Sequence, residues 1–186
     1  YRLVGSEMCI RDRNKGFDVY KKIDDLLSEN KFKNLFEFNF IGRIPDNLKF
    51  KNSNLNSPKS GEELSNEIKK NDFYITGSIN EPSGNHHIEA AQCGLPILYI
   101  ESGGITEYCE GYGIKYTINN LEEKLYYALE NCEKYYEKVE NYPRNADLMS
   151  EEFLVFFNEL LSNRENLINN RSCLLYTSDA ADDLYR

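Results

Sequence analysis

The fold follows from one stretch near the middle of the chain, Glu81-Pro82-Ser83-Gly84-Asn85-His86-His87-Ile88-Glu89-Ala90-Ala91-Gln92-Cys93-Gly94-Leu95-Pro96. Two carboxylates bracket a small polar loop, and this loop leads into a short helix that we expect to begin near Asn85 or His86. Glu81 then lies before the helix and Glu89 one turn inside it, so both carboxylates can face one cleft above the helix N-terminus. Carboxylates accept hydrogen bonds from hydroxyls, and loop N–H groups hold phosphate oxygens. The stretch therefore predicts a site for a sugar nucleotide.

Strand and helix patterns alternate along the rest of the chain. Strands are expected at residues 35–41, 73–76, 97–100 and 114–116, with a short extended piece near 48–51. Helices are expected at residues 14–28, 61–70, 86–93, 105–109, 121–139 and 150–161, the last two closing the domain. The run 97–100 is entirely apolar, which suits a strand covered on both faces. The alternation predicts an α/β fold with a parallel sheet.

Both ends of the chain resemble translated sequencing adapter. The in-frame translation of a transposase-type library adapter matches Leu3-Val4-Gly5-Ser6-Glu7-Met8-Cys9-Ile10-Arg11-Asp12. The reverse complement of that adapter encodes Cys173-Leu174-Leu175-Tyr176-Thr177-Ser178. We therefore expect residues 1–13 and 172–186 to be non-native, and we exclude them from fold reasoning. The remaining part, residues 14–171, has the size of one domain with its own core.

The composition excludes several classes of protein. The net charge is −9 and the chain has no clustered basic run, which argues against nucleic acid as the main partner. Outside the adapter-like ends the cysteines are Cys93, Cys109 and Cys132, without CxxC spacing or a secretory signal. This usage predicts reduced thiols and a cytoplasmic location. No run approaches the roughly 20 apolar residues that a membrane-spanning helix needs.

Five segments share the order and spacing of motifs found in one enzyme family. They are Asn14-Lys15-Gly16-Phe17, Phe40-Ile41-Gly42, Ser60-Gly61-Glu62-Glu63-Leu64, the Glu81 to Glu89 pair with Glu89-Ala90-Ala91-Gln92-Cys93-Gly94-Leu95-Pro96, and Gly103-Gly104-Ile105-Thr106-Glu107. Together they resemble the C-terminal, donor-binding domain of family 4 retaining glycosyltransferases. The resemblance implies a Rossmann-like parallel sheet flanked by helices, the C-terminal half of a GT-B fold. With residues 1–13 excluded, this sheet would lack its first strand.

The resemblance also implies roles for three charged residues. Glu89 would bind the ribose hydroxyls of a nucleotide-sugar donor, and Glu81 would contact the donor sugar near the reacting carbon. Lys15 would stabilise the departing nucleoside diphosphate, on which negative charge develops. Glu81 and Lys15 are therefore the expected catalytic residues. No metal or cofactor is expected, because the nucleotide sugar is itself the substrate.

Small residues would complete the donor site. Ser83, Gly84 and Asn85 would present backbone N–H groups to the diphosphate, and Gly103 and Gly104 would approach the donor closely. The resemblance is imperfect here, because many relatives have phenylalanine and glycine after the Glu-Pro pair where this chain has Ser83-Gly84. Relatives also carry an arginine a few residues before the lysine, at positions that are adapter-like in this chain.

Each of these residue roles has a simpler alternative explanation. Glu81 could be a solvated loop carboxylate, Glu89 a surface residue of an amphipathic helix, and Lys15 a surface lysine at a helix start. The glycine pair at 103–104 could simply make a turn. His86 and His87 could indicate a metal, but adjacent helical residues point about 100° apart and no third ligand is suitably spaced. Histidines near a phosphate are the better interpretation.

We therefore expect the donor-binding part of a glycosyltransferase that moves a sugar from a nucleotide-sugar donor to an acceptor with retention of configuration. This part should be inactive alone, because the acceptor site would lie in a missing N-terminal domain. That domain would also make any peripheral contact with a membrane. The alternatives are another GT-B enzyme, namely a nucleotide-sugar epimerase or a phosphorylase, and a non-catalytic module that binds sugar nucleotides.

Overall fold

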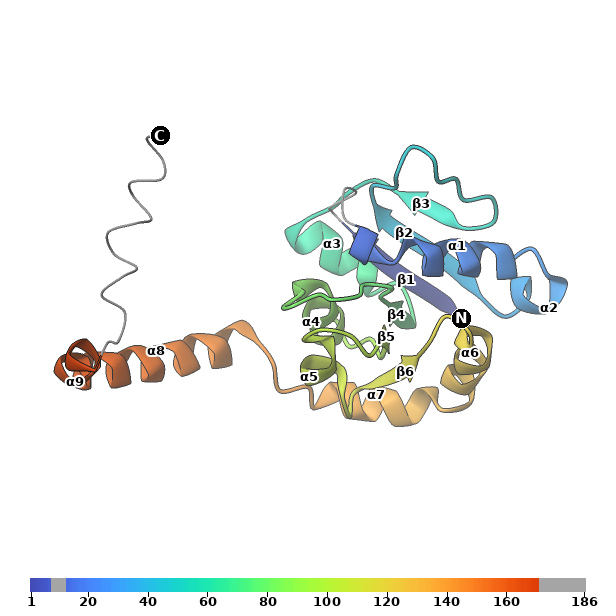
Figure 1. Cartoon of the computed structure of the whole chain (residues 1–186). Coiled ribbons are helices and arrows are strands. Elements are labelled where there is room, and N and C mark those ends of the chain that lie inside the picture. Colours follow the sequence, from blue (N-terminus) through green and yellow to red (C-terminus); the bar gives the residue numbers. More distant parts are fainter. Residues whose placement is uncertain (8–12, 171–186) are drawn as a thin grey trace, which may run out of the picture. The chain divides into compact units, whose positions relative to one another are not determined.

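The computed structural model of the chain describes residues 1–7 and 13–170 (Figure 1). The chain divides into two compact units, Tyr1–Arg144 and Asn145–Arg186, and each is described by itself. Of the residues that we expected to derive from adapter, 8–12 and 172–186 lie outside the described residues.

The described strands of the first unit form one parallel sheet of six, in the order β3-β2-β1-β4-β5-β6 (Figure 1). They are β1 (Arg2–Glu7), β2 (Glu37–Gly42), β3 (Asn54–Asn56), β4 (Phe73–Ile75), β5 (Ile97–Ile100) and β6 (Gly113–Tyr116). The chain builds from β1 outward to β3 on one side, and then from β4 outward to β6 on the other. The strand order therefore reverses between β1 and β4.

Helices cover both faces of this sheet. One face packs against α1 (Phe17–Leu26), α2 (Asn30–Lys33) and α6 (Leu121–Glu130), and the other against α3 (Gly61–Ile68), α4 (Asn85–Gln92) and α5 (Ile105–Cys109). Helix α7 (Cys132–Glu140) contributes to both cores. Successive strand residues point to opposite faces, so Leu3 belongs to the first core and Val4 to the second. The prediction of an α/β fold with a Rossmann-like parallel sheet flanked by helices is confirmed.

The prediction that the sheet lacks its first strand is wrong for this chain. Arg2–Glu7 forms β1 in the centre of the sheet, pairing with β2 along its whole length and with β4 at Leu3 and Val4. Both side chains are fully buried. A central parallel strand needs a short run of small or apolar residues at its buried positions, while its ladder bonds come from the backbone of any residue. Leu3-Val4-Gly5 meets that need.

Two element boundaries also differ from the prediction. The helix expected at residues 121–139 is interrupted at Asn131, between α6 and α7. The side-chain amide of Asn131 donates to the carbonyl of Tyr127 at 2.9 Å and so occupies a carbonyl near the end of α6. The extended piece expected near 48–51 is instead β3, at Asn54–Asn56.

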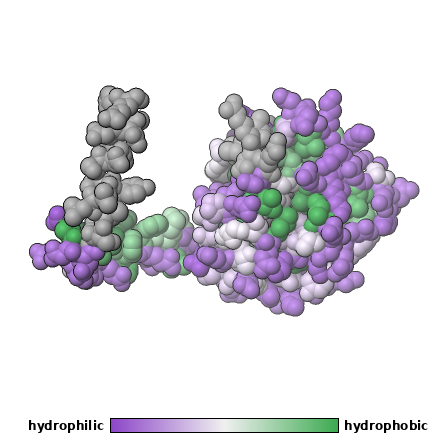
Figure 2. All heavy atoms as spheres, in the orientation of Figure 1, coloured by the Kyte–Doolittle hydropathy of each residue, from purple (hydrophilic) through white to green (hydrophobic). Residues whose placement is uncertain are grey.

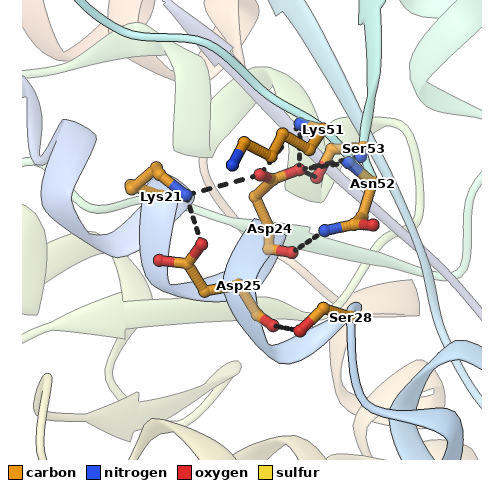
Figure 3. Close-up of polar contacts among 7 residues, drawn as sticks. All are labelled: Lys21, Asp24, Asp25, Ser28, Lys51, Asn52 and Ser53. Carbon is orange, nitrogen blue, oxygen red and sulfur yellow. Dashed lines mark hydrogen bonds and ion pairs between the residues drawn. The ribbon is translucent and has the colours of Figure 1, made fainter.

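A buried carboxylate explains where β3 begins (Figure 3). Asp24 of α1 is fully buried and accepts hydrogen bonds from the backbone N–H groups of Lys51, Asn52 and Ser53 at 2.8–3.0 Å and from the Ser53 hydroxyl at 2.9 Å. Burial by itself raises the pKa of Asp24, but these hydrogen bonds outweigh it and hold the pKa below its ordinary value. The carboxylate therefore ties the loop before β3 to α1.

The second unit contains α8 (Ala146–Ser162) and α9 (Arg164–Asn169), with the Asn145 side chain accepting from the N–H of Leu148 at 2.8 Å as the N-cap of α8. No residue of these two helices is buried. The large apolar side chains that α8 leaves at least half exposed are Met149, Phe153, Leu154, Val155, Phe156, Phe157 and Leu161. Figure 2 shows this apolar surface in green along the helix. The prediction of a helix here is confirmed, and this helix lies in the second unit.

Candidate functional site

Three loops meet at the carboxyl ends of β1, β4 and β5. The N–H of Ile79, after β4, donates to the carbonyl of Asn14 at 2.7 Å. On the other side, the N–H of Asn80 donates to the Ser102 hydroxyl at 2.8 Å and the N–H of Gly104 to the Glu81 carbonyl at 2.8 Å. The loop after β4 is therefore held between its two neighbours, at the point where the strand order reverses.

The contact between the first two loops depends on glycine. Gly16 has φ +66°, a left-handed conformation that L side chains rarely adopt. A Cβ placed on Gly16 would lie 1.8 Å from the carbonyl oxygen of Gly77, which is far inside van der Waals contact. The Lys15-Gly16 turn can approach the β4 loop this closely because neither glycine has a side chain.

Gly103 and Gly104, which we expected to approach a donor, pack closely against the neighbouring loop. A Cβ on Gly103 would lie 2.4 Å from the Glu81 carbonyl oxygen, and one on Gly104 would lie 2.2 Å from that of Pro82. Gly103 also has φ +59°. These glycines therefore shape the site by letting the β5 loop press against the backbone of residues 81–82.

Lys15 and Glu81, the two expected catalytic residues, form an ion pair. Lys15 Nζ lies 2.6 Å from Glu81 Oε2, and the two side chains are only 15% and 18% exposed. The pair joins residues 66 positions apart in the sequence. Because both groups are largely removed from water, their attraction is screened less than that of a surface pair. The structure thus brings these two residues together between the first two loops.

Ser83, Gly84 and Asn85 lie at the start of α4, as expected. Gly84 is the N-cap, and Asn85 is the first residue of the helix. The first N–H groups of a helix have no partner within it, and they carry the positive end of the helix dipole. A Cβ on Gly84 would lie 2.7 Å from His86 Cε1 and 2.9 Å from Glu81 Cγ. The absence of a side chain at Gly84 therefore lets Glu81 and His86 approach each other at the helix N-terminus.

Glu89 lies one turn further along α4, and its side chain is exposed. No hydrogen bond or ion pair joins it to Lys15 or Glu81 among the residues that the structure describes. The structure thus places Glu89 on the helix that begins at the site but does not bring it into the Lys15–Glu81 pair.

His86 and His87, which we expected near a phosphate but without an assigned role, belong to the same cluster. His86 Nε2 lies 3.0 Å from the Thr76 hydroxyl, and burial, with smaller effects of His87 and Lys15, lowers the pKa of His86 to about 3. His87 is fully buried between the rings of His86 and Tyr108, and burial lowers its pKa to about 4. Within residues 1–7 and 13–170, neither ring nitrogen of His87 has a hydrogen-bond partner. Both histidines are therefore neutral at pH 7.

Residues 1–7 and 13–170 offer little support for other kinds of site. No group of three or more His, Cys, Asp or Glu side chains is arranged to hold a metal ion there. None of the described helices has the length and apolar character needed to cross a membrane. A polar groove of about 540 Å³ runs beside Asn39, Asn54 and Asn71, away from the Lys15–Glu81 pair, and these amides are already hydrogen-bonded to one another.

Several solved structures are similar to this chain. Sucrose-phosphate synthase from Thermosynechococcus elongatus aligns with a TM-score of 0.66 at 15% identity, over 87% of this chain and 46% of its own. WaaG, a glycosyltransferase involved in lipopolysaccharide biosynthesis, gives 0.63 at 20% identity, over 78% and 42%. Anabaena Alr3699/HepE, solved in complex with UDP-glucose, gives 0.62 at 16% identity, over 88% and 48%.

These neighbours are glycosyltransferases of the GT-B type, and the chain shares their Rossmann-like α/β fold. The chain spans less than half the length of each of the three. No protein-family model matches the chain. A search of curated protein sequences finds no significant match.

Proposed function

We propose that the chain is the donor-binding part of a family 4 glycosyltransferase, which transfers a sugar from a nucleotide-sugar donor to an acceptor with retention of configuration. The observation that carries the proposal is the Lys15–Glu81 ion pair beside the N-terminus of α4. Ligands of open α/β sheets bind outside the carboxyl ends of the strands, where the strand order reverses. UDP-glucose, bound in one structural neighbour, belongs to the proposed class of ligand.

The diphosphate of the donor binds between Lys15 and the start of α4. Backbone N–H groups at Ser83, Gly84 and Asn85 donate to its oxygens, aided by the positive end of the helix dipole. The Lys15 ammonium adds a point charge. A diphosphate carries several negative charges, whereas Glu81 carries one, so the ligand can attract Lys15 away from Glu81.

Transfer breaks the bond between the anomeric carbon of the sugar and the diphosphate oxygen. Negative charge then grows on that oxygen, and Lys15 and the helix N-terminus stabilise it. The acceptor hydroxyl forms its bond on the face that the diphosphate leaves and passes its proton to the departing diphosphate oxygen, which gives retention. Glu81 accepts hydrogen bonds from the sugar, and Glu89 from the ribose hydroxyls.

The acceptor site belongs to an N-terminal domain outside this chain, so the chain alone binds donor without transferring sugar. That domain makes any peripheral membrane contact, and the protein is cytoplasmic and uses no metal. Residues 1–13 and 172–186 are translated adapter. Sequencing the native locus upstream of Asn14 tests this part. An intact first domain with a glycine-rich loop and a basic pair before Lys15 supports it, and a genomic match to residues 1–13 contradicts it.

The donor site is tested by titrating the full chain with UDP, ADP and GDP, using NMR because it detects weak binding. We expect one of the three to bind, and Lys15→Met to weaken it about tenfold, since a hydrogen bond to a charged group contributes about 1.5–3 kcal/mol. Glu89→Ala should also weaken binding. Matched controls are Lys33→Met on α2 and Glu130→Ala at the end of α6. Both residues are exposed, and their helices pack on the face of the sheet opposite α4.

Lys15→Met leaves the largely buried Glu81 carboxylate without its partner, which destabilises the fold. The double variant Lys15→Met with Glu81→Gln removes both charges, and it separates loss of binding from loss of folding. If none of the three nucleotides binds, or if both site variants bind as the controls do, the proposed donor site is wrong.

A further inference from the structure

His86 lies at the centre of the candidate site and makes one hydrogen bond away from it. Its Nε2 contacts the hydroxyl of Thr76, a fully buried residue directly after β4. The opposite edge of the ring faces the loop: the position of a Cβ on Gly84 is 2.7 Å from His86 Cε1, 3.0 Å from His86 Nδ1 and 2.9 Å from Glu81 Cγ. The Nδ1 edge therefore borders the loop that leads into α4, next to Glu81.

The hydrogen bonds of Thr76 determine which nitrogen of His86 carries the proton. The Thr76 hydroxyl oxygen already accepts from the N–H of Ser78 at 3.2 Å. Within the part of the chain that the structure describes, His86 Nε2 is the one acceptor in reach of the hydroxyl proton. The hydroxyl therefore donates to Nε2, and a neutral imidazole with an acceptor at Nε2 carries its proton on Nδ1.

Burial is the main reason that the ring is neutral, and the nearby charges do not oppose it. Lys15 disfavours the protonated form, Glu81 lies in ion pair with Lys15, and His87 is itself neutral. The ring is half-buried, and no other residue occupies Nδ1 among residues 1–7 and 13–170. Nδ1–H is thus a neutral donor at the N-terminus of α4, beside a lysine.

We propose that His86 is a further binding residue of the donor site, whose Nδ1–H donates a hydrogen bond to an oxygen of the donor diphosphate while Thr76 holds the ring in this tautomer. The inference rests on the proposed function. A phosphate oxygen suits this position because it accepts and never donates, and because Lys15 and the first N–H groups of α4 also attract anions. Thr76 is a positioning residue, since it acts through His86.

The tautomer is measured directly on the full chain. His86 and His87 are its two histidines, so spectra of a ¹⁵N-labelled sample are assigned with one variant, His87→Phe. We expect His86 Nδ1 to be protonated and Nε2 unprotonated, with neither shifting between pH 8 and pH 5. Adding whichever of UDP, ADP and GDP binds most tightly should shift the Nδ1 proton. A proton on Nε2, or an Nδ1 resonance that the nucleotide leaves unmoved, overturns the inference.

Binding variants give a second readout. His86→Phe fills the space without a donor and should weaken nucleotide binding about tenfold. Asn can place an N–H near the position of Nδ1, so His86→Asn should recover most of the affinity, and Thr76→Val should lower it severalfold. His87→Phe makes the same change one residue away and should leave affinity unaltered. If His86→Phe binds like the unmodified chain while Lys15→Met still weakens binding, this inference fails and the proposed function stands. If Lys15→Met also has no effect, the proposed function fails.

Discussion

Replacing Asp24 with alanine should loosen the loop before β3 and destabilise the fold (Figure 3). The buried carboxylate accepts from three backbone N–H groups and one hydroxyl of residues 51–53. A hydrogen bond to a charged group contributes about 1.5–3 kcal/mol, so four independent bonds would give roughly 6–12 kcal/mol. Bonds that share one acceptor are not additive, and water can reach the exposed Lys51 and Asn52 after the change. We expect Asp24→Ala to lower the free energy of unfolding by about 3 kcal/mol.

Two variants sharpen this prediction. Asp24→Asn keeps the shape of the side chain but turns an NH₂ group toward N–H donors. It should therefore lower the free energy of unfolding nearly as much as Asp24→Ala. Asp25→Ala is the matched control, because Asp25 is the next residue of α1, is 65% exposed and also contacts Lys21. An exposed ion pair contributes about 0–1 kcal/mol, so this control should change little.

The effect of Asp24 should also depend on pH. Its pKa is below the ordinary value in the folded protein, so the folded state binds fewer protons than the unfolded state in acid. The stabilisation is complete above the unfolded pKa of about 3.9 and is lost as pH falls through the folded pKa. The difference between the unmodified chain and Asp24→Asn should therefore shrink from pH 7 to pH 3.

Urea unfolding followed by circular dichroism measures these free energies, and hydrogen exchange at the amides of residues 51–53 reports the loop itself. Those amides should exchange faster in Asp24→Ala and not in Asp25→Ala. Equal costs for the two alanine variants, or unchanged protection at 51–53, would refute the reasoning.

Three further predictions concern the site. His87 is buried and neutral with a pKa of about 4, so on acidification the unfolded chain takes up a proton at this residue before the folded chain does. Through this group the free energy of unfolding should fall by about 2 kcal/mol from pH 7.5 to pH 5. His87→Leu should remove that loss when stability is measured by urea unfolding. Gly16→Ala should lower the free energy of unfolding by about 3 kcal/mol or more in the same assay, because its Cβ would lie 1.8 Å from the Gly77 carbonyl oxygen. Gly61 also has a positive φ, +55°, but has open space around it, so Gly61→Ala should lower the free energy of unfolding by only about 1 kcal/mol. Glu81→Gln should tighten UDP binding about threefold in calorimetry, because Lys15 loses its counter-ion, and should weaken UDP-glucose binding; parallel changes for both ligands would contradict the two roles given to Glu81.

The elements next to the site could be predicted from local sequence. The bounds of β5 and α5 are those expected, and α4 differs from prediction by one residue at each end. Helix-terminating residues explain this agreement: Gly94 takes φ +85° just after α4, and Pro96 cannot continue a helix. An uninterrupted apolar run then marks β5, which is covered on both faces.

Contacts between distant segments could not be predicted in this way. The start of β3 depends on Asp24, nearly 30 residues earlier, and no local pattern near residues 48–56 carries that information. The role proposed for His86 depends on Thr76 and on the absence of a side chain at Gly84, whereas the sequence alone shows two adjacent histidines. The apolar positions of α8 predict a helix correctly, but they do not specify which surface it contacts.

The loop after β4 contacts residues 14–16 at three points. The carbonyl of Asn14 accepts from Ile79, the Gly16 turn presses against Gly77, and Lys15 itself pairs with Glu81. Each of these contacts joins residue 14, 15 or 16 to the loop after β4, and none involves residues 1–7. The hydrogen bonds that pair β1 with its neighbouring strands are made by the backbone, so many other short apolar sequences could form the same strand. If residues 1–13 are foreign, as proposed, these three contacts still join native residues, so binding tests on this chain retain this part of the proposed donor site.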